Sequence, residues 1–151
     1  MPNHTSFLPI ATLMFATGIG IPIMAVLNAQ LGQQLASPVA ATSVLFVVGV
    51  VLATLVMVAA GMPDWSRLTM ERPHLYFGAA FILFYALSIT WAAPRIGVGN
   101  AVFFVLIGQL IAAAVIDHFG LLGAIRFEMT ARRGLGLVVM ALGVYLAKRT
   151  V

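Results

Sequence analysis

The most constraining feature of this chain is a run of 59 residues, from Thr5 to Pro63, that contains no Asp, Glu, Lys, Arg or His. A soluble domain needs charged side chains on its surface, and they normally make up about a quarter of its residues. Here only 8% of the 151 residues are charged and 62% are hydrophobic. The chain is therefore predicted to be embedded in a lipid membrane, and an ordinary soluble fold is excluded.

Three further uncharged runs follow, at residues 75–94, 96–116 and 134–147. A bilayer core about 30 Å thick takes about 20 apolar residues of helix, because a helix satisfies its own backbone hydrogen bonds. The first run has room for two spans, and the amides, glycine and Ser-Pro pair between Asn28 and Pro38 indicate an interfacial turn. We predict an all-α integral membrane protein, a bundle of five transmembrane helices. The expected spans are residues 7–27, 39–60, 75–93, 97–116 and 133–148.

The last run is short for a span, but Arg133 and Lys148 at its ends can extend their charges toward water. Five spans leave about 50 residues for loops, so a single transmembrane domain over residues 1–151 is expected. We expect no cleaved signal peptide. The predicted loops on the side of the N-terminus carry five Lys or Arg residues and the opposite side carries three, Lys148 among them. This difference favours a cytoplasmic N-terminus.

Several classes of function lack the residues they need. The chain has no cysteine, which excludes disulfides, thiolate metal sites and a cysteine nucleophile. We found no paired carboxylates, no His-x-x-x-His and no Gly-x-Ser-x-Gly, so an enzyme, a metal site and a cofactor are not expected. The net charge of +4 comes from scattered basic residues, so no nucleic-acid partner is predicted. A channel would need a selectivity filter, and no filter-like segment is evident.

Polar and large aromatic side chains inside the spans are candidates for a substrate pathway, because a polar group in hydrocarbon is costly. The candidates are Asn28, Gln30, Trp91, Asn100 and Gln109. The same amides could instead cap helices or form hydrogen bonds between helices, and the aromatic side chains could belong to an interfacial belt. Trp91 and Tyr85 are the aromatic residues predicted to lie deepest.

Asp117 and His118 are candidates for coupling or gating. An aspartate at the C-terminal end of a helix faces the negative end of the helix dipole, so it needs a partner. His118, Arg126 and Arg132 are the expected partners. With His118, Asp117 could form a proton-sensitive pair. The alternative is a salt-bridged hinge that closes the following loop.

A set of motifs extends over nearly the whole chain. They are Asn28-Ala29-x-Leu31-Gly32, Gly49, Gly108-Gln109-Leu110, Asp117-His118-Phe119-Gly120-Leu121-Leu122-Gly123, and Arg133-Gly134-x-Gly136 leading to Gly143-Val144-x-Leu146. In these motifs the chain resembles the YdcZ-type family of the drug/metabolite transporter superfamily. The resemblance implies a transporter of the plasma membrane, in bacteria the inner membrane, equivalent to one five-helix repeat of larger members. Similar small multidrug exporters use a glutamate in the first helix, but residues 7–27 contain no acid, so that mechanism does not carry over.

The expected function is transport or export of an unidentified small molecule by alternating access. Transporters often place their site between two inverted repeats, so a half-size chain is expected to form a homodimer, or a heterodimer with a homologue. An inverted dimer would fit the weak charge difference between the two sides. Small residues allow helices to approach closely. The candidates are Ala16, Gly20, Gly49 and Ala53. The alternative function is a non-transporting accessory membrane subunit.

Overall fold

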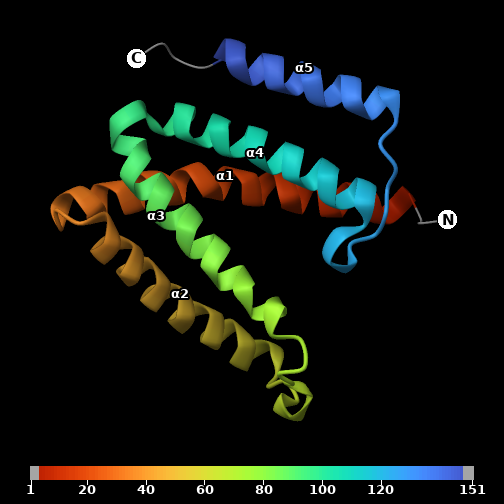
Figure 1. The fold of residues 1–151 in the computed structure, drawn as a ribbon. Coiled ribbons are helices and arrows are strands. Elements are labelled where there is room, and N and C mark those ends of the chain that lie inside the picture. Colours follow the sequence, from red (N-terminus) through yellow and green to blue (C-terminus); the bar gives the residue numbers. More distant parts are fainter. Residues whose placement is uncertain (1–3, 148–151) are drawn as a thin grey trace. The chain divides into compact units, whose positions relative to one another are not determined.

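A computed structural model describes residues 4–147, which form five α-helices and three short 3-10 turns (Figure 1). The chain divides after Arg95 into two compact units. Unit 1 contains the first three α-helices and unit 2 contains the last two. The helices are α1 (His4–Gln34), α2 (Pro38–Ala60), α3 (Gly78–Ile96), α4 (Val98–Phe119) and α5 (Ala131–Ala147). The all-helical prediction is confirmed for the described residues.

Four helical segments are long and apolar enough to cross a membrane. They are Phe7–Gln34, Pro38–Ala60, Pro73–Ile96 and Val98–Phe119. The fifth helix, α5, has 17 residues, which corresponds to about 26 Å at the usual helical rise. The predicted end of the fifth span, Lys148, lies outside the described residues. A membrane crossing by α5 therefore stays a prediction.

The first helix is longer than predicted. It continues through the segment expected to form an interfacial turn and ends at Gln34 instead of Leu27. Alanine, leucine and glutamine are good helix formers, so residues 28–34 gain more from helical hydrogen bonds than from an early reversal. The chain reversal is confined to residues 35–37.

The reversal between α1 and α2 is built from two capping motifs. The Ser37 amide donates to the Gly32 carbonyl at 2.9 Å and the Ala36 amide donates to the Gln33 carbonyl at 3.1 Å, which is a Schellman arrangement. Ala36 adopts a left-handed φ of 49° in this motif. The Ser37 hydroxyl then accepts from the Ala40 amide at 3.1 Å, and Pro38 occupies the first turn of α2. The reversal is therefore stabilised by its own backbone and by one serine.

The loop between α2 and α3 carries a small polar turn, η1 (Trp65–Arg67). Asp64 caps it by accepting from the Ser66 hydroxyl at 2.6 Å and from the Ser66 amide at 3.1 Å. These hydrogen bonds favour the carboxylate and hold the pKa of Asp64 below its ordinary value of 3.8. A second short turn, η2 (Pro73–Phe77), leads into α3.

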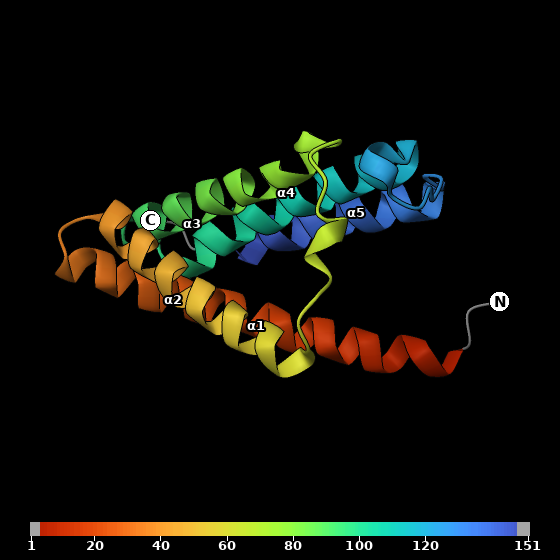
Figure 2. The same cartoon turned by 90° about the horizontal axis from the view of Figure 1, so that it is seen from below.

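In unit 2, α4 and α5 lie side by side and run in opposite directions (Figures 1 and 2). α4 ends at Phe119 and is capped by Gly120, whose φ of 63° is left-handed and whose amide donates to the Ile116 carbonyl. A short turn, η3 (Leu121–Gly123), follows, and an extended segment leads to α5. Glycine at this C-cap suits a sharp helix end, because it takes up positive φ without strain.

Candidate functional site

A buried polar cluster joins the three helices of unit 1. Asn28 of α1 donates its Nδ2 to the Thr90 hydroxyl of α3 at 2.5 Å and lies 3.5 Å from the Thr42 hydroxyl of α2. Thr90 in turn donates to the Ala86 carbonyl at 2.7 Å. All three side chains are buried. We call Asn28, Thr42 and Thr90 the Asn28 junction, in which the candidate pathway residue Asn28 forms interhelical hydrogen bonds.

Small residues surround the Asn28 junction and let the helices approach closely. A Cβ on Gly32 would lie 3.1 Å from Thr90 Cγ2 and 3.7 Å from Ala41 Cβ, so a side chain there would push against Thr90. The fully or nearly buried alanines are Ala25, Ala29, Ala41, Ala86 and Ala93. In lipid, such close packing and interhelical hydrogen bonds replace the hydrophobic effect as the source of helix association.

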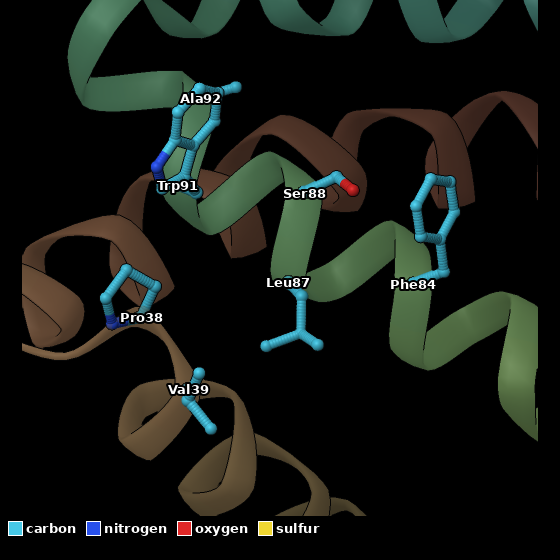
Figure 3. Close-up of a pocket in the computed structure, with 7 residues that line it drawn as sticks. All are labelled: Pro38, Val39, Phe84, Leu87, Ser88, Trp91 and Ala92. Carbon is cyan, nitrogen blue, oxygen red and sulfur yellow. The ribbon is translucent and has the colours of Figure 1, made fainter.

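An apolar cavity of about 570 Å³ opens between the start of α2 and one face of α3. Figure 3 shows the side chains that line it, which we call the Trp91 groove. They are Pro38, Val39, Phe84, Leu87, Ser88, Trp91 and Ala92. Of the candidate pathway residues in unit 1, Trp91 lines this groove, whereas Asn28 and Gln30 do not.

Arg95 is held against Trp91 at the end of the groove. Its guanidinium carbon lies 4.3 Å from the centre of a Trp91 ring, and one guanidinium N–H donates to the Trp91 carbonyl. This arrangement combines a cation–π contact with a hydrogen bond one helical turn apart. Arg95 also lines a second cavity of about 360 Å³, the Arg95 cavity. The other lining residues are Ala29, Gly32, Gln33, Ala36, Pro38, Thr90 and Pro94.

A third cavity, of about 380 Å³, lies among the helices of unit 1 and is lined by Tyr85. We call it the Tyr85 cavity. Its other residues are Met24, Leu45, Phe46, Gly49, Val50, Ala53, Ile82 and Ala86. The Tyr85 hydroxyl is buried and has no hydrogen-bond partner among residues 4–147. A buried hydroxyl without a partner is costly, at about 1–3 kcal/mol, so this group has an unused capacity to bind a polar atom.

In unit 2, Asp117 has the partner that its position at a helix end demands, but not one of those predicted. Its Oδ2 forms an ion pair with the Arg133 guanidinium at the start of α5, and both side chains are about one-third exposed. The expected partners His118, Arg126 and Arg132 are therefore wrong for this structure. Arg133 is favoured because α5 brings it directly to the end of α4, beside which it packs.

His118 stabilises the loop between α4 and α5 through its ring and its backbone. Its Nδ1 accepts from the Met129 amide at 3.0 Å, and its carbonyl accepts from Arg126 Nε at 3.2 Å. The Asp117 carbonyl accepts from the Phe127 amide at 2.8 Å. The acceptor role of Nδ1 places the proton of a neutral His118 ring on Nε2. These contacts hold the α4–α5 loop against the end of α4, and both the hinge and the gating interpretation of this segment stay open.

The remaining candidates lie on different helices. Gln30 is exposed on α1 and Gln109 is exposed on α4. Asn100 is buried near the start of α4, and its Nδ2 donates to the Ile96 carbonyl at 2.9 Å. Within residues 4–147 no three His, Asp or Glu side chains gather into a possible metal site.

Sequence reasoning missed Thr42 and Thr90, and little in the sequence could have revealed them. Threonines inside apolar helices commonly bond back to their own helix, as Thr12 does to the Leu8 carbonyl and Thr54 to the Val50 carbonyl. Thr90 also does so, while accepting from Asn28. Only the packing of the helices distinguishes this threonine from the others.

Comparison with known proteins gives one match that covers most of the chain. The family model described as "Putative inner membrane exporter, YdcZ" matches residues 9–146. No curated protein and no solved structure matches the chain.

Proposed function

The chain belongs to the YdcZ family of inner membrane exporters, and from that premise we propose that it is a half-size exporter of a small molecule. It is a transporter-like, multi-pass protein of the inner membrane, with four helices able to cross the bilayer. We propose that α5 supplies a fifth crossing and that the N-terminus is cytoplasmic. The family match over residues 9–146 is the observation that carries the proposal.

The Tyr85 cavity is the proposed solute site. It is lined by apolar side chains and by Tyr85, whose buried hydroxyl has no partner in the described chain, and mostly apolar walls with a few polar groups are usual in small-molecule pockets. The Tyr85 hydroxyl can donate and accept, so it would fix the orientation of one polar atom of the solute. Trp91 and the amides Gln30, Asn100 and Gln109 stay candidates for a substrate pathway, and Asn28 keeps the helices of unit 1 together.

The proposed working unit is a dimer that moves solute by alternating access. None of the most apolar 18-residue window of α2 is buried, so its surface is free to contact lipid or another subunit. A homodimer or a heterodimer with a homologue would supply the second repeat, and an inverted pair would have the symmetry common in transporters. The Asp117–Arg133 ion pair and His118 are the proposed gate, because they close the α4–α5 loop.

The test begins with purified full-length protein in detergent, whose unfolding temperature is measured against a library of metabolites and cationic drugs. A ligand that binds only the folded state raises that temperature. Tyr85→Phe removes only the hydroxyl without a partner, so the variant without ligand is expected to unfold at the same temperature or higher. The ligand-induced rise is expected to be lost. Tyr76→Phe is the matched control, because its hydroxyl bonds the Thr69 carbonyl in a loop.

A stabilising compound is then loaded into vesicles containing the protein, and its counterflow is measured. Transport by wild type and not by Tyr85→Phe would support the proposal. A stabilising compound whose effect survives Tyr85→Phe would refute the assigned site. If no compound stabilises a well-folded protein, or if the vesicles move none of them, the accessory-subunit function becomes the better account.

A further inference from the structure

We propose that unit 1 binds one anionic phospholipid, with its phosphate at Arg95 and one acyl chain in the Trp91 groove. The proposal does not depend on transport. It follows from the position of a single cation, Arg95, in a cavity that also contains Gln33 and Thr90, at one end of an apolar groove.

The charge at this place is isolated. Residues 5–63 contain no charged side chain, and no Asp or Glu occurs between Glu71 and Asp117. Arg95 is therefore the only charged residue that lines any of the cavities described in unit 1. It is exposed, and it contacts the Trp91 ring and the Trp91 carbonyl. No carboxylate in the part of the chain that the structure describes pairs with Arg95, so its remaining N–H groups are available for an anion.

The Arg95 guanidinium is also held in place for binding. The stack on Trp91 and the hydrogen bond to the Trp91 carbonyl restrict an otherwise flexible side chain at the last turn of α3. Arginine binds phosphate through several directed N–H groups, and it loses less entropy when its geometry is fixed beforehand. Gln33 lines the same cavity and brings an amide donor to it. The Arg95 cavity thus offers the hydrogen-bond donors that a lipid phosphate needs.

The Trp91 groove adjoins this polar end. Pro38 lines both cavities, and Arg95 of one cavity contacts Trp91 of the other, so the two are neighbours near the start of α2. From Trp91 to Phe84 the groove follows about 10 Å of helix. Ser88 is the only lining residue with a polar side chain apart from the Trp91 indole. The volume of about 570 Å³ and the apolar lining suit part of an acyl chain (Figure 3).

A phospholipid explains the two halves of the site together. Arg95 disfavours a cationic drug, and a small soluble anion would leave the apolar groove without an occupant. A single Arg or Lys near the surface contributes about fivefold to the affinity for an anionic lipid. The groove would add selectivity for a ligand that is attached to a hydrocarbon chain.

The experiment compares phosphatidylglycerol and phosphatidylcholine with identical acyl chains, added to the purified full-length protein in detergent. The readouts are the unfolding temperature and the lipid retained in native mass spectrometry. Phosphatidylglycerol is expected to stabilise the wild type more and to be retained one per chain. Arg95→Gln is expected to lower its affinity about fivefold, to the level of phosphatidylcholine. Arg72→Gln, which removes an exposed loop arginine outside the cavities, is expected to keep full affinity.

A second variant tests the groove itself. Leu87→Trp fills the Trp91 groove and leaves Arg95 in place, so retention of phosphatidylglycerol is expected to fall. The proposal is overturned if both lipids bind equally, if Arg95→Gln and Arg72→Gln have equal effects, or if Leu87→Trp leaves retention unchanged. Inorganic phosphate and glycerol phosphate serve as the soluble probes. Equal stabilisation by either of them would make this a site for soluble anions and would also overturn the proposal.

Discussion

Two amide side chains of α1 lie two residues apart and have different surroundings. Asn28 is 4% exposed and donates to Thr90, whereas Gln30 is exposed. Residues two positions apart on a helix point about 200° apart around its axis. One amide can therefore lie between the helices while the other faces lipid or water. At the scale of single residues, the sequence shows the polar groups but not the direction in which each points.

Asn28→Ala is expected to destabilise the protein by about 1 kcal/mol. The substitution removes the donor to Thr90 and the contact with Thr42, and interhelical hydrogen bonds in membranes contribute about 0.6–1.7 kcal/mol. The measurement is the free energy of unfolding in mixed detergent micelles. Gln30→Ala is the control and should leave the free energy of unfolding unchanged. Equal losses in the two variants would mean that the Asn28 junction does not stabilise the helices.

The connections between elements depend on backbone conformations that few residues accept. Gly97, between α3 and α4, has φ of 82° and ψ of 145°, a region that is essentially restricted to glycine. Ala36 also has a positive φ, but its value of 49° lies in the left-handed helical region, which alanine can enter at moderate cost. The two turns therefore differ in their tolerance of side chains.

Gly97→Ala is expected to destabilise the protein by about 1–3 kcal/mol, because a Cβ strains this backbone conformation. Gly99→Ala is the control and is expected to increase the stability of the protein. Gly99 lies inside α4 with open space around its Cβ position, and alanine is the better helix former there by about 1 kcal/mol. Thermal unfolding in detergent measures the stability of the two variants. A Gly97→Ala variant as stable as Gly99→Ala would contradict the backbone assignment.

The Asp117–Arg133 ion pair is expected to hold the α4–α5 loop closed. Asp117→Asn keeps the shape of the side chain and removes its charge, which should cost about 1 kcal/mol for a partly exposed pair. Amide hydrogen exchange across residues 120–130 should become faster. Glu128→Gln removes the exposed partner of Arg126, 3.8 Å away, and should leave exchange unchanged. Unchanged exchange in Asp117→Asn would argue against a gate at this loop.

At the scale of the whole molecule, the proposed dimer makes a prediction about small residues on α1. Gly18 and Gly20 both have open space around their Cβ positions, so neither packs within the described chain. They point to opposite sides of α1. Gly20→Leu is expected to abolish cross-linked dimer if Gly20 lies at a close helix contact, and Gly18→Leu is expected to preserve it. Single-cysteine cross-linking in native membranes measures this, and a dimer that survives Gly20→Leu would remove Gly20 from the interface.

Much of the fold could be predicted because its main determinant is the length of uncharged runs. The helices α2, α3 and α4 begin and end within a few residues of the predicted spans. The predicted end of α1 is too early, because the amide side chains that suggest a turn are also compatible with a helix, which continues to Gln34. The contact between Asn28 and Thr90 joins residues 62 positions apart, and no local pattern encodes it. The partner of Asp117 was missed because Arg132 and Arg133 are neighbours in sequence but point about 100° apart on a helix.

The length of α1 has a consequence for the membrane in which the protein works. Its 31 residues extend about 46 Å, whereas the hydrocarbon core is about 30 Å thick. The hydrogen bond from Asn28 to Thr90 opposes sliding of α1 past α3. We therefore expect a thinner or thicker bilayer to tilt the helices of unit 1 together, with a cost that rises with each ångström of mismatch. The stability of this protein should accordingly depend on the acyl-chain length of the surrounding lipid.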